Sequence, residues 1–222
     1  MNKLIAIAAA LILATSTAFA APSEKDSAGG LKEALTQGAG SAVSLLGRKD
    51  GFLANPKVHI PLPDSARQAE KLLRLMGKGE ELDALETAMN RAAEAAVPQA
   101  KTLLISAVKQ MSFDDARQIL TGGEGAATRY FRSKTEATLT TQFLPIVKQT
   151  TGRFKLAGQY NDLAGKASAM GLLKPEDASV ERYVTRKALD GLYLLIAEEE
   201  KKIRENPLAA VGKLARLVFG SL

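Results

Sequence analysis

Apolar residues recur every three to four positions along most of this chain, which is the period of an amphipathic helix. Over residues 31–47 the repeat is set by Leu31, Leu35 and Leu46, and Gly47 follows as a helix stop. The strict alternation of apolar and polar residues that marks a half-buried strand is not seen. The pattern therefore predicts an all-α fold.

The same spacing, bounded by glycines, prolines and capping residues, predicts a single-domain bundle of seven or eight helices. Beyond the first helix, the predicted ranges are 64–77, 80–111, 112–122, 125–150, 153–170, 177–205 and 207–219. Pro98 and Pro145 fall inside two of them and should kink or split them, because proline leaves the carbonyl one turn earlier without its donor. Ser112 and Asp115 have the spacing of a capping box.

Residues 48–63 break the helical pattern. Asp50-Gly51 and Asn55-Pro56 are turn signals. The stretch 57–63 should be extended, because each of its prolines disfavours helix in the residue before it. Asp64 then caps the next helix, whose apolar face is expected to point inward. The residues of that face are Ala66, Ala69, Leu72, Leu73 and Met76.

The first twenty residues have the pattern of a secretory signal peptide. Lys3 precedes an apolar run, and Ala18-Phe19-Ala20 forms a cleavage site. The alternative is a membrane anchor, but the run is about half of the ~20 residues that a span needs. Cleavage after Ala20 predicts a soluble periplasmic protein with a flexible leader over 21–30 and one helical domain over 31–220. No later segment is apolar enough to span a bilayer.

Composition narrows the available chemistry. The chain has no cysteine and one histidine, which excludes disulfides, thiolate catalysis and metal sites built on several histidines. We therefore expect no cofactor and no catalytic residue. His59, the single histidine, is interpreted as a partly covered loop residue rather than as part of a catalytic triad. With 5% aromatic residues and a net charge of +6, nucleic-acid binding is not expected.

Basic residues cluster at 129–155 and at 201–222, where they outnumber acidic residues. A surface polarised in this way can meet an anionic envelope component or an acidic partner protein. The alternative is that these charges only keep the protein soluble. The predicted helix at 207–219 is amphipathic, so it either covers the core or lies in a membrane interface.

Two charged residues fall on apolar helical stripes, where an unpaired charge is costly. Glu199 lies among Leu192, Leu195, Ile196 and Ile203, and Lys134 follows Tyr130 and Phe131. We expect Lys134 and Glu199 to meet in a partly buried polar cluster, unless both side chains extend outward to solvent independently. Further candidate members of this cluster are Arg132, Asn90, Arg91 and Tyr160.

Several longer motifs resemble the bacterial family described as domain of unknown function 4197. They are DGFLANPKVHIPLP at 50–63, MNRAAE at 89–94, MSFDDARQILTGGEGAATRYFRSKT at 111–135, FLPIVKQ at 143–149 and YVTRKALDGLYLLIAEEEKKIRENP at 183–207. The resemblance covers about 27–220 and implies an exported, mostly helical protein. It implies no activity and no catalytic residue.

Three functions remain open at this point. The first is a non-enzymatic envelope protein that binds a partner or ligand. The second is a carrier of an apolar or lipid-like ligand in a cavity between helices, which the proline kinks at Pro98 and Pro145 would hold apart. The third is an acid/base enzyme centred on Glu199 and Lys134.

Overall fold

The computed structural model describes residues 24–205, which form eight α-helices and two short 3-10 turns and no strand. The predicted all-α bundle is therefore confirmed over this part of the chain. The predicted signal peptide at 1–20 and the predicted helix at 207–219 lie outside the described residues. The helices are α1 (Glu24–Leu46), α2 (Asp64–Leu75), α3 (Gly79–Ala96), α4 (Ala100–Gln110), α5 (Phe113–Thr121), α6 (Ala126–Thr151), α7 (Lys155–Ala169) and α8 (Val180–Glu205).

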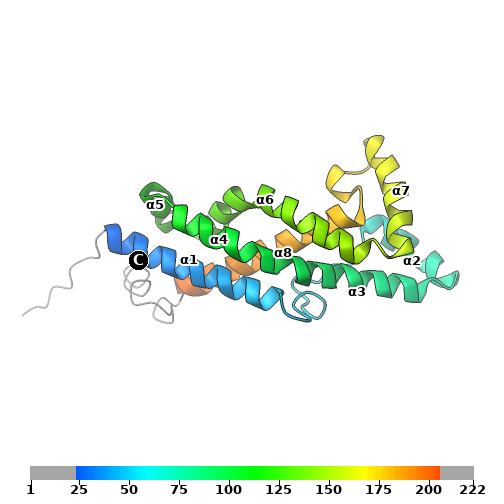
Figure 1. The fold of residues 1–222 in the computed structure, drawn as a ribbon, viewed down its shortest axis with the longest axis horizontal. Helices are drawn as coiled ribbons and strands as arrows, with labels where there is room; N and C mark the ends of the chain where they lie inside the picture. The colour runs from blue at the N-terminus through cyan, green and yellow to red at the C-terminus, as the bar shows by residue number, and fades with distance from the viewer. Residues whose placement is uncertain (1–23, 206–222) are drawn as a thin grey trace, which may run out of the picture.

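Five helices, α1, α3, α4, α6 and α8, run along the long axis and enclose the core (Figure 1). α8 packs most extensively against α6 and also contacts α1 and α3. Its Tyr193 is buried, and the Tyr193 hydroxyl lies 2.8 Å from the Thr135 hydroxyl of α6. α5 closes one end of the bundle, while α2 and α7 stand at the other end (Figure 1).

The two prolines behave differently. α3 ends at Ala96, and a 3-10 turn containing Pro98 leads into α4, so the long predicted helix is split as expected. By contrast, α6 continues as one helix through Pro145, and the predicted interruption there is wrong. Pro145 removes the donor for the carbonyl of Thr141, and Thr141 is exposed, so water can satisfy that carbonyl.

The flexible leader predicted for 21–30 is wrong over 24–30. α1 begins at Glu24, and Ala28 and Gly30 are buried in it. Glycine and serine lower the intrinsic preference for helix, but packing of small side chains against the bundle overrides that preference.

The capping box predicted for α5 is confirmed. The Ser112 hydroxyl accepts a hydrogen bond from the Asp115 amide at 3.0 Å, and the Ser112 amide donates to the Asp115 carboxylate at 2.9 Å. Because an N-terminal turn leaves its first amides without helical partners, these bonds set the start of α5.

The irregular segment 48–63 is fastened to α3 by three side chains spaced four residues apart, Glu86, Asn90 and Glu94. The Glu94 carboxylate is buried and accepts hydrogen bonds from the amides of Phe52 and Leu53, each at 3.1 Å. These bonds satisfy backbone donors that have no helical or strand partner.

Asn90 holds the next part of the segment. Its side chain accepts a hydrogen bond from the Ile60 amide and donates one to the Ile60 carbonyl, both at 2.9 Å. His59 is half-buried, with Nε2 2.8 Å from the Glu86 carboxylate and Nδ1 2.9 Å from the Leu53 carbonyl oxygen. This placement agrees with the interpretation of His59 as a partly covered loop residue.

The extended stretch is shorter than predicted. The amides of Val58 and His59 both donate to the carbonyl of Asn55, at 3.1 and 2.8 Å, so a turn occupies the first part of 57–63. Only the last residues, up to Pro63, are free of regular structure, and α2 begins directly after them.

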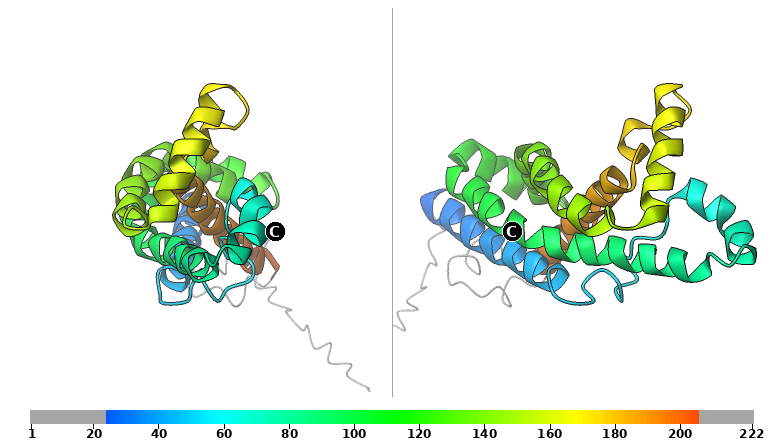
Figure 2. Two further views of the ribbon diagram at one scale, coloured as in Figure 1. Left: turned by 90° about the vertical axis from the view of Figure 1, so that its right-hand side faces the viewer. Right: turned by 45° about the vertical axis from the view of Figure 1, so that its right-hand side comes forward.

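α2 forms as predicted, but only part of its apolar face points inward: Ala66 and Leu73 pack against the core, whereas the expectation is wrong for Leu72 and Met76. It buries no residue, and Leu72, Leu75 and Met76 at its outer end are 62%, 79% and 66% exposed. α2 lies at the end of the molecule (Figure 2).

Candidate functional site

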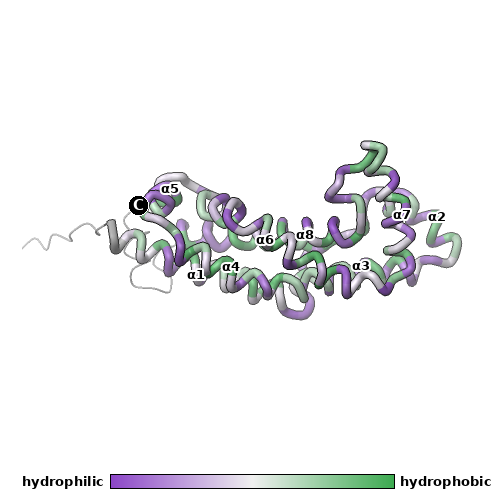
Figure 3. The backbone as a smooth tube through the Cα atoms, turned by 45° about the horizontal axis from the view of Figure 1, so that its top comes forward, coloured by the Kyte–Doolittle hydropathy of each residue, from purple (hydrophilic) through white to green (hydrophobic). Residues whose placement is uncertain are grey.

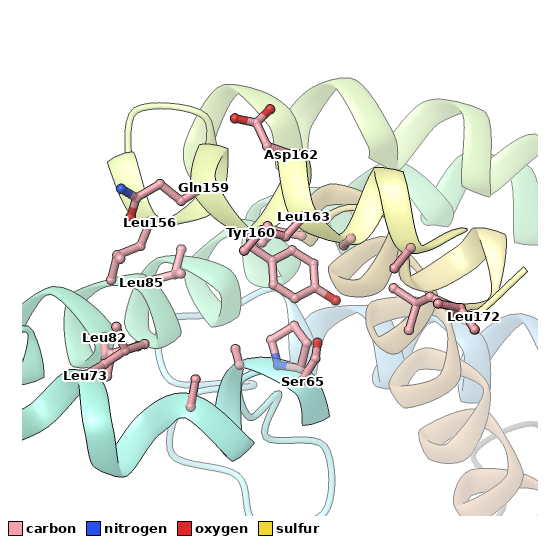
Figure 4. Close-up of a pocket in the computed structure, with 17 residues that line it drawn as sticks. Ser65, Leu73, Leu82, Leu85, Leu156, Gln159, Tyr160, Asp162, Leu163 and Leu172 are labelled. Carbon is pink, nitrogen blue, oxygen red and sulfur yellow. The ribbon is translucent and has the colours of Figure 1, made fainter. Parts of the chain in front are cut away.

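The main hollow of the described chain is a cleft of about 690 Å³ between α2, α3 and α7, reaching the start of α8. Figure 4 shows it with α7 on one side, α2 on the other, and α3 closing one end. We call it the α2–α7 cleft. It lies at the end of the molecule away from α5 (Figure 1).

The cleft is lined mainly by apolar side chains. The apolar lining residues are Pro63, Ala66, Ala69, Leu73, Leu82, Leu85, Leu156, Leu163, Ala164, Ala167, Leu172, Leu173 and Val180. The polar lining residues are Ser65, Gln159, Tyr160 and Asp162. Asp162 points away from the hollow in Figure 4, so no charged side chain of the lining points into it. Such a surface favours apolar ligands that are oriented by a few hydrogen bonds.

Tyr160 is the polar side chain that reaches farthest into the cleft. Its ring extends from α7 toward Ser65 at the start of α2 (Figure 4). The phenol donates a hydrogen bond to the carbonyl of Asp177 at 3.0 Å. Burial raises the pKa of Tyr160, while a hydrogen bond with Ser65 lowers it. Tyr160 thus bridges three elements at the inner end of the cleft and remains neutral at ordinary pH.

The α7 side of the cleft is firmly anchored to α8. Asn161 accepts a hydrogen bond from the Val180 amide at 2.8 Å and donates one to the buried Glu181 carboxylate at 2.9 Å. The Thr151 hydroxyl donates to the same carboxylate at 3.4 Å. Buried polar groups that are satisfied in this way fix the relative position of the helices that carry them.

The α2 side is held much less firmly. Arg74 of α2 donates to Glu70 at 2.9 Å and to Asp83 of α3 at 2.6 Å. The pair with Arg74 lowers the pKa of Asp83 and raises that of Arg74. All three side chains are substantially exposed, and exposed ion pairs contribute little to stability. One wall of the cleft is therefore fixed and the other is only lightly attached.

Exposed apolar side chains gather at this end of the molecule. Of the eight large hydrophobic residues exposed in the described chain, six belong to α2, α7 and the turns that follow them: Leu72, Leu75, Met76, Leu163, Met170 and Leu172. Figure 3, in which the backbone is coloured by the hydropathy of each residue, shows hydrophobic residues at the outer ends of both helices. Single exposed apolar residues are normal on a protein surface, whereas several at one end of a molecule call for an explanation.

The predicted contact between Lys134 and Glu199 is not formed. Lys134 is exposed, with its ammonium 5.6 Å from the centre of the Tyr130 ring. Glu199 bonds to Lys202 at 2.7 Å on α8, and its Cβ lies against Gly38 of α1. The outward course of both side chains, which was the alternative, describes them better.

The other candidate members of that cluster are also apart. Arg132 pairs with Glu136 at 2.6 Å and lies 4.6 Å from the centre of the Tyr193 ring. Arg91 pairs with Glu94 at 2.6 Å, and Asn90 binds the 48–63 segment as described above. Only Tyr160 lies in the cleft.

The buried acid near the end of α8 is Glu200, not Glu199. Its carboxylate accepts hydrogen bonds from the amides of Ala127 and Thr128 at 3.2 and 3.1 Å, and from Arg204 Nε at 3.1 Å. The sequence signal for it was present, because Glu200 follows Ile196 by one helical turn. The i,i+4 spacing of Glu200 and Arg204 is typical of an ion pair on a solvated helix face, but in the structure this pair is largely buried.

Between residues 24 and 205, no helix is both long and apolar enough to cross a membrane. Comparisons of the chain with curated proteins and with solved structures found no match. A family model does match, over residues 21–220, and its description is "Protein of unknown function (DUF4197)". Because the match covers nearly the whole chain, the protein belongs to the DUF4197 family.

Proposed function

We propose that this protein binds the hydrophobic part of a small ligand, such as an acyl chain, in the α2–α7 cleft. The observation that carries the proposal is the cleft itself, which holds about 690 Å³ between mainly apolar walls. Ligand sites usually have volumes of about 300–1,000 Å³ and a predominantly apolar lining. Burial of apolar ligand surface contributes roughly 25 cal/mol per Å², before the entropic cost of association.

The polar groups of the lining limit the chemistry of the ligand. Ser65, Gln159 and Tyr160 can exchange hydrogen bonds with a neutral group, but none of them compensates a buried charge. The buried part of the ligand is therefore uncharged. A charged head group, where present, stays at the open side of the cleft.

The wider role in the proposal is that of a non-enzymatic carrier or partner-binding protein of the cell envelope. Export is supported by the signal-peptide pattern ahead of Ala20. The acid/base alternative receives no support, because Lys134 and Glu199 have different neighbours and form no joint site.

Titration with a fluorescent fatty acid tests the proposal. Ala69 and Ala167 line opposite walls, so Ala69→Phe and Ala167→Phe should fill the cleft and weaken binding by about tenfold or more, equivalent to ~1.4 kcal/mol. Ala137→Phe, at an exposed position on α6, is the matched control and should bind as the wild type does. Far-UV circular dichroism verifies that each variant is folded.

Two results would overturn the proposal: absence of saturable binding to the wild-type protein, or equal binding by the folded cleft variants. Purification from the periplasm followed by mass spectrometry of extracted small molecules identifies the natural ligand.

A further inference from the structure

Two segments at the cleft end of the molecule share one arrangement of residues. Residues 71–78 read KLLRLMGK and residues 166–174 read KASAMGLLK. Each begins and ends with lysine, contains no acidic residue, and carries a Met-Gly pair at the turn that follows its helix. We call these segments the α2 tip and the α7 tip.

Both tips present a methionine to solvent. Met76 and Met170 are 66% and 73% exposed, and each precedes a glycine with positive φ, Gly77 at 76° and Gly171 at 74°. Left-handed backbone at glycine reverses the chain directly after the helix. The reversal leaves each methionine at the outer end of its helix, beyond the part of the helix that packs against the rest of the molecule.

A ligand inside the cleft does not cover these residues. Leu75, Met76 and Met170 are not among the residues that line the cleft, so they stay in water when it is filled. Exposed apolar surface has a free-energy cost that grows with its area. A second binding event, distinct from occupation of the cleft, is needed to remove it from water.

We propose that the α2 and α7 tips insert their apolar side chains into the surface of an anionic lipid bilayer. The inference rests on the proposed function only for the purpose of the membrane contact, because a membrane is where an acyl-chain ligand resides. Because α2 and α7 are the walls of the cleft, attachment at their outer ends places the opening of the cleft beside the lipid.

Three lysines at the tips suit an anionic surface. Lys71, Lys166 and Lys174 form no ion pair within residues 24–205, whereas Arg74 and Lys78 pair with neighbouring acids. Lysine beside inserted apolar residues lays its methylene stem along them and keeps its ammonium at the level of the lipid head groups. Each such lysine near an anionic leaflet is attracted to it and strengthens the attachment.

The shape of the two tips favours a bilayer over a protein partner. They are the ends of two separate helices that project from the body of the molecule (Figure 2). A stable protein interface usually buries a continuous area of about 800 Å² on each side. Two separate convex ends do not offer such an area, but a fluid bilayer adapts to each of them independently.

Co-sedimentation with lipid vesicles tests the inference on full-length protein purified from a periplasmic extract. Wild-type protein should bind phosphatidylcholine vesicles that contain phosphatidylglycerol, and bind pure phosphatidylcholine vesicles more weakly. The variants Leu75→Ser/Met76→Ser and Met170→Ser, all at positions outside the cleft lining, should each lose about tenfold or more in partitioning. The matched control is Phe113→Ser, since Phe113 is 65% exposed on α5 at the other end, and it should bind like wild type.

The inference fails if wild-type protein does not bind the vesicles, or if the tip variants bind them as well as Phe113→Ser does. It also fails if the tip substitutions change the oligomeric state in sedimentation velocity without vesicles, because the tips would then contact protein. Fatty-acid titration of the tip variants separates the two proposals. If the tip variants bind the fatty acid as wild type does but no longer bind vesicles, the membrane contact is supported. If wild-type protein does not bind the fatty acid but binds vesicles through its tips, only the carrier function is contradicted.

Discussion

The Glu200 carboxylate of α8 caps the N-terminus of α6 by accepting hydrogen bonds from both the amide and the hydroxyl of Thr128, at 3.1 and 3.0 Å. This contact joins two helices that are 72 residues apart in sequence at their point of contact. A carboxylate is favoured at a helix N-terminus by the free amides and by the helix dipole. The pair therefore fixes the register of the two longest helices in the described chain.

Glu200→Ala should lower the free energy of unfolding by about 3–5 kcal/mol, because it removes a buried carboxylate that pairs with Arg204 and leaves two α6 amides without their acceptor. Urea denaturation followed by circular dichroism measures the loss. Glu198→Ala is the control, since Glu198 pairs with Lys57 at a more exposed position and should lose about 1 kcal/mol or less. Equal losses in the two variants would contradict the buried cap.

Asn90→Ala should destabilise the protein by about 1–3 kcal/mol for each Ile60 backbone group that it leaves unpaired. The first measurable sign should be faster hydrogen exchange of the Ile60 amide. For comparison, Asn55→Ala removes only an exposed 3.2 Å bond from the Lys57 amide and should change stability far less. Unchanged exchange at Ile60 would show that Asn90 does not hold the segment.

The capping box of α5 should make the stability of the folded protein depend on pH in the acid range. Hydrogen bonds from Ser112 lower the pKa of Asp115 below its ordinary value of 3.8. The stabilisation is therefore present above that value and is lost as the pH falls through the lower pKa of the folded protein. Asp115→Asn should remove this part of the pH dependence and cost about 1 kcal/mol near neutral pH. Thermal unfolding measured from about pH 5 to about pH 2 checks this, given the usual Asp range.

Alkaline titration should show delayed ionisation of tyrosine. Burial raises the pKa of Tyr183 and of Tyr193 to about 12. The unfolded chain ionises near pH 10, so stability is full below that pH and is lost as the pH rises through the folded values. Ultraviolet titration of native protein should show two phenols ionising near pH 12, and the same titration in urea should show all four tyrosines ionising together near pH 10. Ionisation of all four near pH 10 in the native protein would contradict their burial.

The fold could be predicted from the sequence wherever helix boundaries have a local cause. Periodicity, the Ser112 cap and the split at Pro98 each depend on residues within a few positions of one another. The direction in which a helix faces has no such local cause. The apolar stripe of α2 shows that one side of the helix avoids water, but only the arrangement of distant helices decides whether that side is covered.

The error at Glu199 has a similar origin. Consecutive residues on a helix point about 100° apart, so Glu199 and Glu200 lie on the two edges of one apolar stripe. Which edge meets the start of α6 depends on the rotation of α8 within the bundle. The sequence did not predict that Glu86 and Glu94 hold the 48–63 segment, for another reason. Their partners are backbone amides, and because nearly every residue has one, the sequence gives no sign of which amide is bound.

For the proposed ligand-binding function, the light attachment of α2 determines how a ligand enters and leaves the cleft. Because none of its side chains is fully buried and its ion pair with α3 is exposed, α2 should detach at a free-energy cost far below that of unfolding the bundle. Amide hydrogens of α2 should then exchange earlier than those of α8. Entry and release of a ligand would be limited by the opening of one short helix, so substitutions in α2 alone would tune residence time and leave the core unaltered.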